Sequence, residues 1–456
     1  MFKIIKVILL YLNYINIFSI QEGIVNLNFI KKIPDLNGLT PENVIFPGLQ
    51  DNEIITEINI GTQPQKIPMN INLYHYSFFI AGEFQNETQQ NNIRFKQSNS
   101  ISFKQYEKIG NFGGRGYTLG YKASDFFYFN FNQEKKYNIS FILASDPEDG
   151  VSGTLGFKLN EEEDNEIIEY NFINQLKKAK AIKDYYFTIQ YLNYTYGNII
   201  IGDLPGNYDK RYKNMEYRDT YIVEPNSPRS WNIQFDSIYT KFSGEKDIKD
   251  LGKFIGYFRI DLGVTIGSEE YRKEFMDNFM NEQIDKGICE EKFVIYYYTY
   301  YCNDNVDFSK MKNLYFFNKE LNYSFEFNYK DLFFYNKLDN KYYFLIEFEK
   351  NTNKNNRWLL GEFFFKKYQL IFNQDKKKIG IYIGNNKEIN QNDKQSWINK
   401  NKWYLILIIS LMLLLIVISL LIYYIIKNKP RRKMKANELL DDNYDYDNPI
   451  NNDSKE

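Results

Sequence analysis

Residues 53–65 read EIITEINIGTQPQ, a run rich in isoleucine and threonine that leads directly into a glycine. β-Branched side chains favour the pleated, half-buried environment of a strand, and a glycine after such a run is typical of the turn that ends it. This stretch therefore predicts a β-strand over residues 53–60 and a turn at Gly61.

Similar runs recur throughout residues 51–387. Residues 198–201 read NIII, and Gly197 and Gly202 lie on either side of them. Helical periodicity is scarce, with candidates at residues 166–178 and 271–286, and no internal repeat of short period is found. We therefore expect a mainly β structure that is too long for one small barrel.

The composition agrees with a β-rich fold and argues against several kinds of function. Phe, Tyr and Trp make up 18% of the 456 residues, and these side chains favour strands and bury large areas. The 57 basic and 58 acidic residues nearly cancel, so no nucleic-acid partner is expected. Two cysteines and one histidine are too few for a His/Cys metal site, and neither a metal nor a cofactor is expected.

Both ends of the chain carry signals of the secretory pathway. Residues 1–19 combine a basic start with a short apolar run, which is typical of a signal peptide; a buried strand or helix is the alternative. Residues 403–426 carry no charge, and ~20 apolar residues suffice to cross a bilayer as a helix. Basic residues follow at once, so the positive-inside rule places the tail, residues 427–456, in the cytosol. With residues 388–402 as a polar stem, the sequence predicts a single-pass type I membrane protein whose ectodomain is lumenal or extracellular.

A lumenal ectodomain allows two kinds of covalent modification. Cys289 and Cys302 can form a disulfide in an oxidising compartment, with two free buried thiols as the alternative. The acceptor motif for N-glycosylation occurs before the membrane segment at Asn86, Asn138, Asn193 and Asn322.

Six segments between residues 58 and 382 resemble those of one known family. They read INIGTQPQ at 58–65, GTLGF at 153–157, NIIIGD at 198–203, SWNIQFDSI at 230–238, IDLGVT at 260–265, and WLLGEFF at 358–364 continuing to KIGIY at 378–382. In this order they resemble the pepsin-like aspartic peptidases. The resemblance implies an all-β, two-lobed fold with a peptide-sized cleft, with lobes at 51–225 and 226–387. Residues 20–50 resemble the family's pro-segment or form a first strand.

The resemblance also implies where the catalytic carboxylates belong. In this family one Asp from each lobe holds a water, and the two carboxylates share one proton because both cannot ionise so close together. Asp261 stands at the second-lobe position, whereas Asn72 replaces the first Asp, and an amide can neither titrate nor act as a base. No Asp occurs between Asp51 and Asp125 to replace it.

Other parts of the implied site are altered as well. Leu73 and Leu262 stand where the family has a Thr after each catalytic Asp, whose hydroxyl orients the site across the two lobes. The flap hairpin is expected in a glycine-rich stretch, with Gly113 at the position of the family's Tyr and Phe112 or Tyr117 as substitutes.

Three hypotheses on function follow. The first is a membrane-anchored, aspartic-peptidase-like protein that is catalytically impaired and binds a peptide or protein in its cleft. The second is an active endopeptidase with an unusual dyad, for which His75 and Asp261 offer one pairing, although a histidine with no catalytic role is the favoured interpretation. The third is a structural or adhesive surface protein with an idle cleft.

Overall fold

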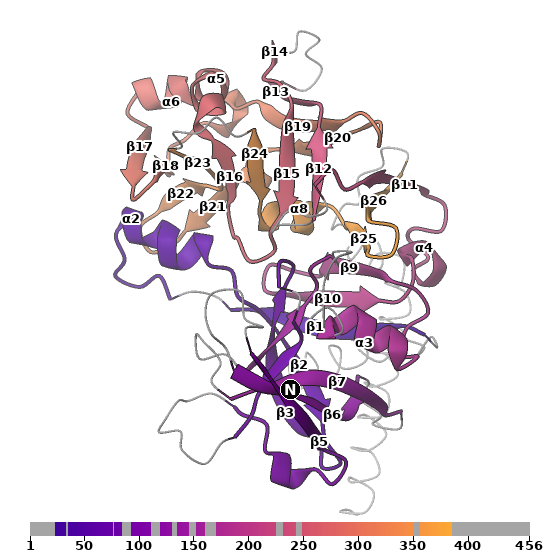
Figure 1. Cartoon of the computed structure of the whole chain (residues 1–456). Coiled ribbons are helices and arrows are strands. Elements are labelled where there is room, and N and C mark those ends of the chain that lie inside the picture. Colours follow the sequence, from indigo (N-terminus) through magenta and orange to yellow (C-terminus); the bar gives the residue numbers. More distant parts are fainter. Residues whose placement is uncertain are drawn as a thin grey trace, which may run out of the picture. The chain divides into compact units, whose positions relative to one another are not determined.

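The computed structural model describes residues 23–32, 35–75, 77–83, 93–110, 119–129, 135–145, 152–159, 170–224, 231–242, 249–350 and 356–384 (Figure 1). The predicted signal peptide, stem, membrane segment and tail lie outside these residues, and so do Asn86 and the predicted flap residues Phe112, Gly113 and Tyr117. No helix in the described ranges is long and apolar enough to cross a membrane.

A large sheet of 13 described strands contains most of the first half of the chain. Its strand order is β11-β26-β25-β9-β10-β1-β2-β3-β8-β4-β7-β6-β5. The bounds are β1 Val25–Lys31, β2 Ile54–Ile60, β3 Gln65–Asn72, β4 Phe79–Ala81, β5 Lys104–Gly110, β6 Leu119–Tyr128, β7 Tyr137–Ala144, β8 Gly153–Gly156, β9 Tyr186–Tyr191, β10 Tyr196–Ile201, β11 Glu216–Tyr221, β25 Ile371–Asn373 and β26 Lys378–Ile383.

Two further sheets occupy the second half. The second sheet is built from β12 Asn232–Phe235, β15 Phe254–Phe258, β16 Thr265–Ser268, β17 Cys289–Val294, β18 Tyr297–Asn303, β21 Phe333–Asn336, β22 Lys341–Phe344, β23 Ile346–Glu349 and β24 Arg357–Leu360. The small sheet is built from β13 Ser237–Lys241, β14 Lys249–Asp250, β19 Asn313–Asn318 and β20 Tyr323–Phe327.

Short helices connect the strands. The α-helices are α2 Pro41–Val44, α3 Phe172–Lys178, α4 Pro205–Tyr208, α5 Glu269–Phe279, α6 Asn281–Asp285, α7 Tyr329–Leu332 and α8 Glu362–Lys367; a π-helical turn spans Ile45–Gln50, and 3₁₀ turns span Gln97–Asn99 and Phe308–Lys310. The two strands predicted from isoleucine-rich runs are confirmed as β2 and β10. The helix predicted at 271–286 is present as α5 and α6, and the described part of the other candidate contains α3.

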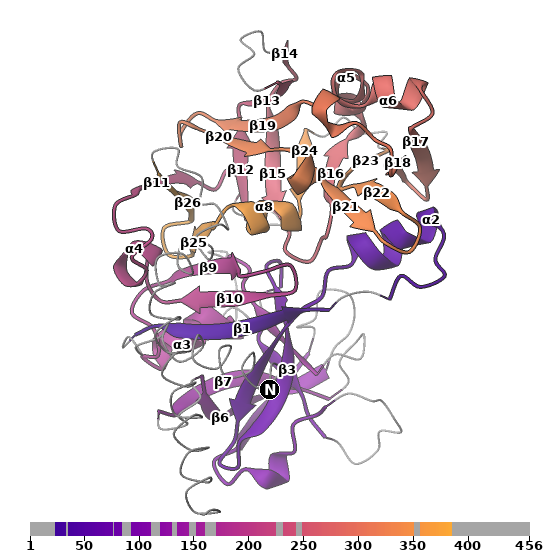
Figure 2. The same ribbon diagram turned by 180° about the vertical axis from the view of Figure 1, so that it is seen from behind.

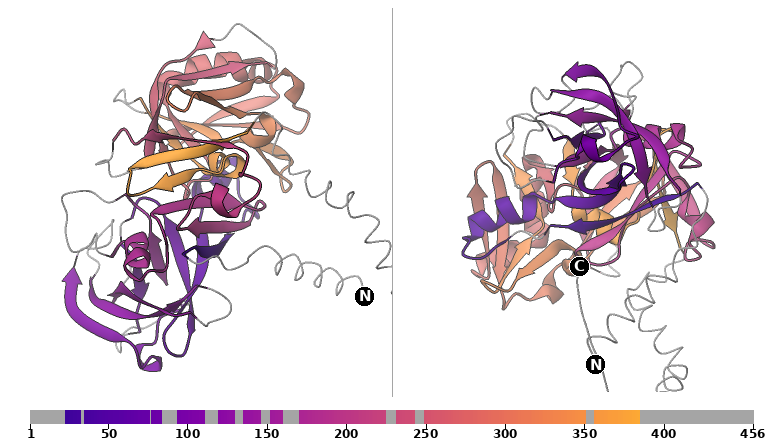
Figure 3. Two further views of the ribbon diagram at one scale, coloured as in Figure 1. Left: turned by 90° about the vertical axis from the view of Figure 1, so that its right-hand side faces the viewer. Right: turned by 90° about the horizontal axis from the view of Figure 1, so that it is seen from below.

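The end of the chain returns to the large sheet. Strand β25 pairs with β9, and β26 pairs with β11, so the last strands of the second half complete a sheet begun by the first (Figure 3). Aromatic rings fill the core at this junction: Phe187 stacks on Phe372 with centroids 4.8 Å apart, and Trp231 packs edge-on against Phe372. The indole nitrogen of Trp231 donates a 2.7 Å hydrogen bond to the carbonyl of Phe157, which joins the two halves.

One local arrangement occurs in both halves. Strand β3 ends at Asn72 and runs parallel to β8, with Asn72 opposite Gly156. Strand β15 ends just before the Asp261 turn and runs parallel to β24, with Phe258 opposite Leu360. Each half therefore places a turn at the carboxyl end of a strand whose parallel neighbour leads to a Leu-Gly pair, Leu155-Gly156 at the end of β8 and Leu360-Gly361 where β24 ends.

Candidate active site

The first turn (residues 72–75) follows directly from β3. The side-chain oxygen of Asn72 accepts hydrogen bonds from the backbone amides of Tyr74 at 2.9 Å and His75 at 3.0 Å. An Asn or Asp side chain that binds the backbone two residues on stabilises a turn of this kind. The carbonyl of Asn72 accepts a bond from the amide of Phe157, and Leu73 is buried. Asn72 thus shapes the turn and supplies no titratable group.

The second turn (residues 259–264) contains Asp261. The guanidinium of Arg259 binds both carboxylate oxygens: Nε donates to Oδ1 at 2.7 Å and a terminal nitrogen donates to Oδ2. The side chains of Arg259 and Asp261 are 13% and 22% exposed. A two-point contact between a guanidinium and a carboxylate is among the strongest side-chain hydrogen bonds in proteins. Asp261 is therefore neutralised within its own turn.

Arg259 also links the second turn to the first. Its guanidinium carbon lies 4.3 Å from the ring centroid of Tyr74, an arrangement that favours the cation. Burial acts to lower the pKa of Arg259, but the bond and charge of Asp261, with a smaller contribution from Tyr74, raise it above its ordinary value. The two turns thus approach each other with Arg259 in contact with both.

His75 lies at the end of the first turn, beside Tyr74. Its ring lies 4.8 Å from that of Tyr74, and its carbonyl accepts a bond from the amide of Lys158. The carboxylate of Asp261 is bound by Arg259, and the pairing of His75 with Asp261 stays a prediction.

Gly361 and the buried Glu362 pack against the second turn. The amide of Glu362 donates to the carbonyl of Leu262 at 2.8 Å, and a Cβ on Gly361 would lie 2.0 Å from the carbonyl oxygen of Val264. Glycine is therefore the residue that fits at 361. Nζ of Lys31, in β1, donates a 2.6 Å hydrogen bond to Oε2 of Glu362. Lys31 therefore contacts the residue whose backbone amide binds the second turn.

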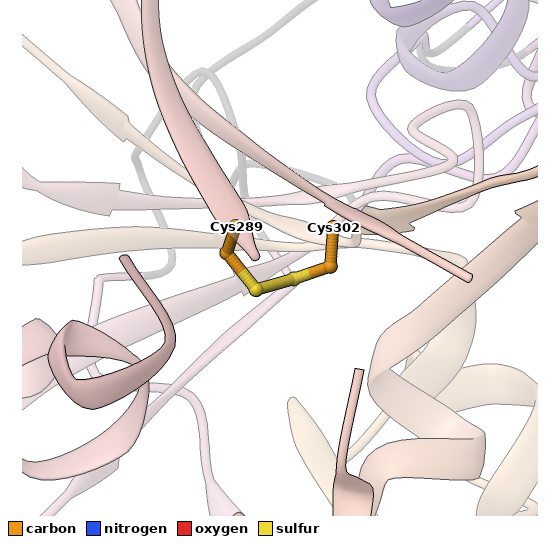
Figure 4. Close-up of a disulfide and its surroundings, with 2 residues drawn as sticks. All are labelled: Cys289 and Cys302. Atoms are coloured by element: carbon orange, nitrogen blue, oxygen red, sulfur yellow. A yellow bond between two sulfur atoms is a disulfide. The ribbon is translucent and has the colours of Figure 1, made fainter. Parts of the chain in front are cut away.

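The predicted disulfide is confirmed. Cys289 and Cys302 face each other across the antiparallel hairpin of β17 and β18, with Cα atoms 4.0 Å apart (Figure 4). Asn138, Asn193 and Asn322 are all exposed, and their glycosylation stays a prediction. Within the described ranges, no group of three or more His, Cys, Asp or Glu side chains is placed to hold a metal ion.

Sequence reasoning missed Arg259. Arg259 lies two residues before Asp261. Two side chains at this spacing lie on one face only when the backbone between them has a suitable extended or turn conformation, which the sequence alone does not reveal. A basic residue this close to the expected catalytic Asp was the available signal.

Comparison with known proteins identifies the family. The chain matches the family of eukaryotic aspartyl proteases over residues 53–382, which is well over half of its length. No curated protein matches the chain closely enough to be counted as a relative. With its mainly β structure and the paired turns described above, the chain belongs to the eukaryotic, pepsin-like aspartyl protease family.

Proposed function

We propose that this chain is a membrane-anchored, aspartyl-protease-like protein of the secretory pathway that does not perform two-carboxylate hydrolysis and binds a peptide or protein in its interlobe cleft. The observation that supports this proposal best is the contact between Arg259 and Asp261.

The reaction of this family needs two carboxylates that share a proton around one water. Asn72 supplies an amide in place of the first carboxylate and uses its oxygen to bind backbone amides. Arg259 occupies both oxygens of the second carboxylate. A water at this place would find neither a shared proton nor a free carboxylate to act as base, which argues for loss of catalysis.

Loss of the orienting hydroxyls is compatible with a stable fold. Replacing both partners of a buried hydrogen bond by apolar groups is often nearly neutral for stability. Leu73 is buried and Leu262 packs beside a hydrophobic cluster, so both leucines add apolar contact. The chain can therefore retain its two turns without retaining the reaction.

The two turns still present groups that suit recognition of a peptide. Tyr74 contributes an aromatic ring and Arg259 a guanidinium at the partly exposed point where the turns meet. Binding sites of this kind combine apolar surface with a few convergent polar groups.

Two observations support the secretory location. The disulfide between Cys289 and Cys302 is typical of an oxidising compartment. The uncharged residues 403–426, followed by a basic cluster, have the length and flank of a membrane anchor.

The proposal is tested with the full-length chain in detergent and a diverse synthetic peptide library. We expect mass spectrometry to find intact peptides that stay bound to the wild-type chain. The Tyr74→Ala variant should bind them more weakly. Tyr239→Ala, a change in the small sheet where Tyr239 stacks on Tyr315, is the matched control. Equal retention by both variants, or no retention at all, would argue against binding at the turns. Cleaved peptides whose formation depends on Asp261 would instead identify an active endopeptidase.

A further inference from the structure

The hairpin of β17 and β18 ends in an exposed apolar turn. Pairing in β17 ends at Val294, so Ile295 and Tyr296 form a two-residue loop. Phe293, Ile295 and Tyr296 are 49%, 63% and 65% exposed. Residues 293–296, here called the tip, belong to a hairpin at the rim of the second half, on the left in Figure 1 and on the right in Figure 2. Single exposed apolar residues are ordinary, whereas three in one turn indicate a contact surface.

The backbone of the tip is strained at Ile295. This residue has φ +56°, in the left-handed region, where a β-branched residue is an outlier. Glycine is typical of such a position in a two-residue hairpin loop, and asparagine also tolerates it. With 63% of its surface exposed, the isoleucine gains little packing to offset the cost of this conformation. Strain of this kind often accompanies a functional contact, so the tip calls for a partner outside the fold.

Aromatic and basic side chains surround the tip. The ring of Phe293 lies 4.9 Å from that of Tyr298, its partner in β18, and Nζ of Lys350 lies 5.3 Å from the centroid of Phe293. The amide of Lys350 donates a 2.8 Å hydrogen bond to the carbonyl of Tyr296, which attaches the loop to the end of β23. Exposed aromatic side chains with lysines beside them are typical of protein surfaces at the lipid–water interface.

The charges beside the tip are compatible with a lipid surface. Glu291, farther from the turn in β17, accepts hydrogen bonds from two nitrogens of Arg272, so its charge is compensated locally. Lys292 and Lys350 border the turn together with Glu349. The turn therefore carries no excess of negative charge that would oppose its approach to phospholipid headgroups.

We infer that the tip inserts its apolar side chains into the surface of the membrane that anchors the chain. This inference rests on the proposed function, because it uses the anchor at residues 403–426. A protein partner fits the tip less well, since a stable interface covers ~800 Å² of each partner, far more than three side chains offer. A lipid contact can be small, because the anchor holds the tip at a high effective concentration near the bilayer.

The chain between the fold and the anchor is long enough for this contact. The described residues end at 384 and the predicted anchor begins at 403, so 18 residues, 385–402, lie between them. When fully extended, 18 residues span at most ~65 Å. A domain the size of residues 23–384 has a radius of gyration of ~21 Å. The anchor therefore allows the side of the domain that carries the tip to face the bilayer.

The test uses the full-length chain in phosphatidylcholine vesicles with and without bromine on the acyl chains. Tyr296→Trp places a fluorophore in the tip, and the emission of this variant minus that of wild type reports on that side chain alone. Bromine quenches on contact, so we expect brominated lipid to remove most of this emission. The matched control is Leu338→Trp, a 59% exposed position in the turn between β21 and β22, at the opposite end of β18. Its emission should not change.

A second variant separates lipid contact from folding. Ile295→Asn removes an apolar side chain, but asparagine adopts the left-handed conformation more readily. The variant should therefore have a urea midpoint at least as high as its parent. Combined with Tyr296→Trp, it should lose much of the quenching by brominated lipid. If Ile295 served the fold alone, Ile295→Asn would lower the urea midpoint and leave the quenching unchanged.

Three results would overturn the inference. The first is equal quenching of both fluorophores, and the second is no quenching at either position. The third is a fluorophore at position 296 that is shielded from iodide in solution but not quenched by bromine, which would indicate a second copy of the chain or another protein at the tip. Release of the chain by alkaline carbonate would show that the proposed anchor is wrong. The same variants, added to preformed vesicles, then decide whether the tip binds lipid without it.

Discussion

Lys31 and Glu362 form a buried ion pair across 331 positions of sequence, with Nζ and Oε2 2.6 Å apart and side chains only 6% and 4% exposed. The pair joins β1, an interior strand of the large sheet, to the helix that supports the second turn. Lys366 lies 3.0 Å from the same carboxylate. Burial and, to a smaller extent, repulsion from Lys31 lower the pKa of Lys366 to about 8, against the opposing effect of Glu362.

We predict that Lys31→Met destabilises the chain by about 2–3 kcal/mol, because removing one partner of a buried ion pair leaves a buried charge with fewer compensating contacts. Glu362 keeps its contact with Lys366 in this variant, which limits the loss of stability. Urea unfolding followed by near-ultraviolet circular dichroism measures the change. The control is Lys32→Met. The ion pair between Lys32 and Glu53 is exposed to solvent and should contribute less than ~1 kcal/mol to the free energy of unfolding. Similar losses from both variants would contradict the role given to Lys31.

Glu347 predicts a pH dependence of stability. Burial raises its pKa to about 8, from an ordinary value of 4.5, despite the opposing hydrogen bond from Gln50. Between these two pH values the folded chain holds a proton that the unfolded chain has released. Stability from this group is therefore fully present below about pH 4.5 and is lost as the pH rises through 8. The loss is at most about 5 kcal/mol, since one pKa unit corresponds to ~1.4 kcal/mol.

Glu347→Gln should flatten this slope, because the amide has a similar shape and cannot ionise. The measurement is the urea midpoint between pH 4.5 and 9 for wild type and variant. Glu349→Gln, at an exposed position of the same strand, is the matched control and should keep the wild-type slope. An unchanged slope in Glu347→Gln would assign the pH dependence to another group.

The topology proposed from residues 403–426 makes a separate prediction. In sealed vesicles, added protease should remove only the tail, residues 427–456, and leave a fragment that contains the disulfide-linked Cys289 and Cys302. Detergent should make the rest of the chain accessible. Digestion of the ectodomain in intact vesicles would show that the chain has the opposite orientation or is not anchored.

Local features of the fold could be predicted from the sequence, whereas its long-range contacts could not. Isoleucine runs beside glycines predicted β2 and β10, because strand preference and turn residues act over a few neighbouring positions. The bond between Gln50 and Glu347 and the return of β25 to β9 join residues more than 180 positions apart, and no short pattern in one sequence carries such pairings.

The candidate site shows the same division. Asn72 and Asp261 were located by segments that resemble a family, and both lie in turns at strand ends. Arg259 was missed because its importance depends on the direction of its side chain, which reaches both Asp261 and Tyr74. Motif position identifies a residue but not the neighbour that neutralises it.

The final prediction concerns peptide hydrolysis. Wild-type chain should cleave no peptide by the two-carboxylate mechanism between about pH 3 and pH 6, the range in which such dyads work. Asn72→Asp alone should restore little activity, because Arg259 still binds both oxygens of Asp261 and would also attract the new carboxylate. Removing one member of a catalytic unit usually abolishes most of the rate, so a partial repair is expected to remain poor.

The informative variant is therefore the double change Asn72→Asp/Arg259→Leu, which supplies the second carboxylate and frees the first. We expect it to exceed either single variant in cleavage of a peptide library analysed by mass spectrometry, yet to stay slow because Leu73 and Leu262 provide no orienting hydroxyls. Adding Asp261→Ala to the double variant is the control and should remove all cleavage. If wild type itself cleaves specific peptides and Asp261→Ala does not, the ion pair with Arg259 must open during turnover. Asp261 would then act with a group other than Asn72.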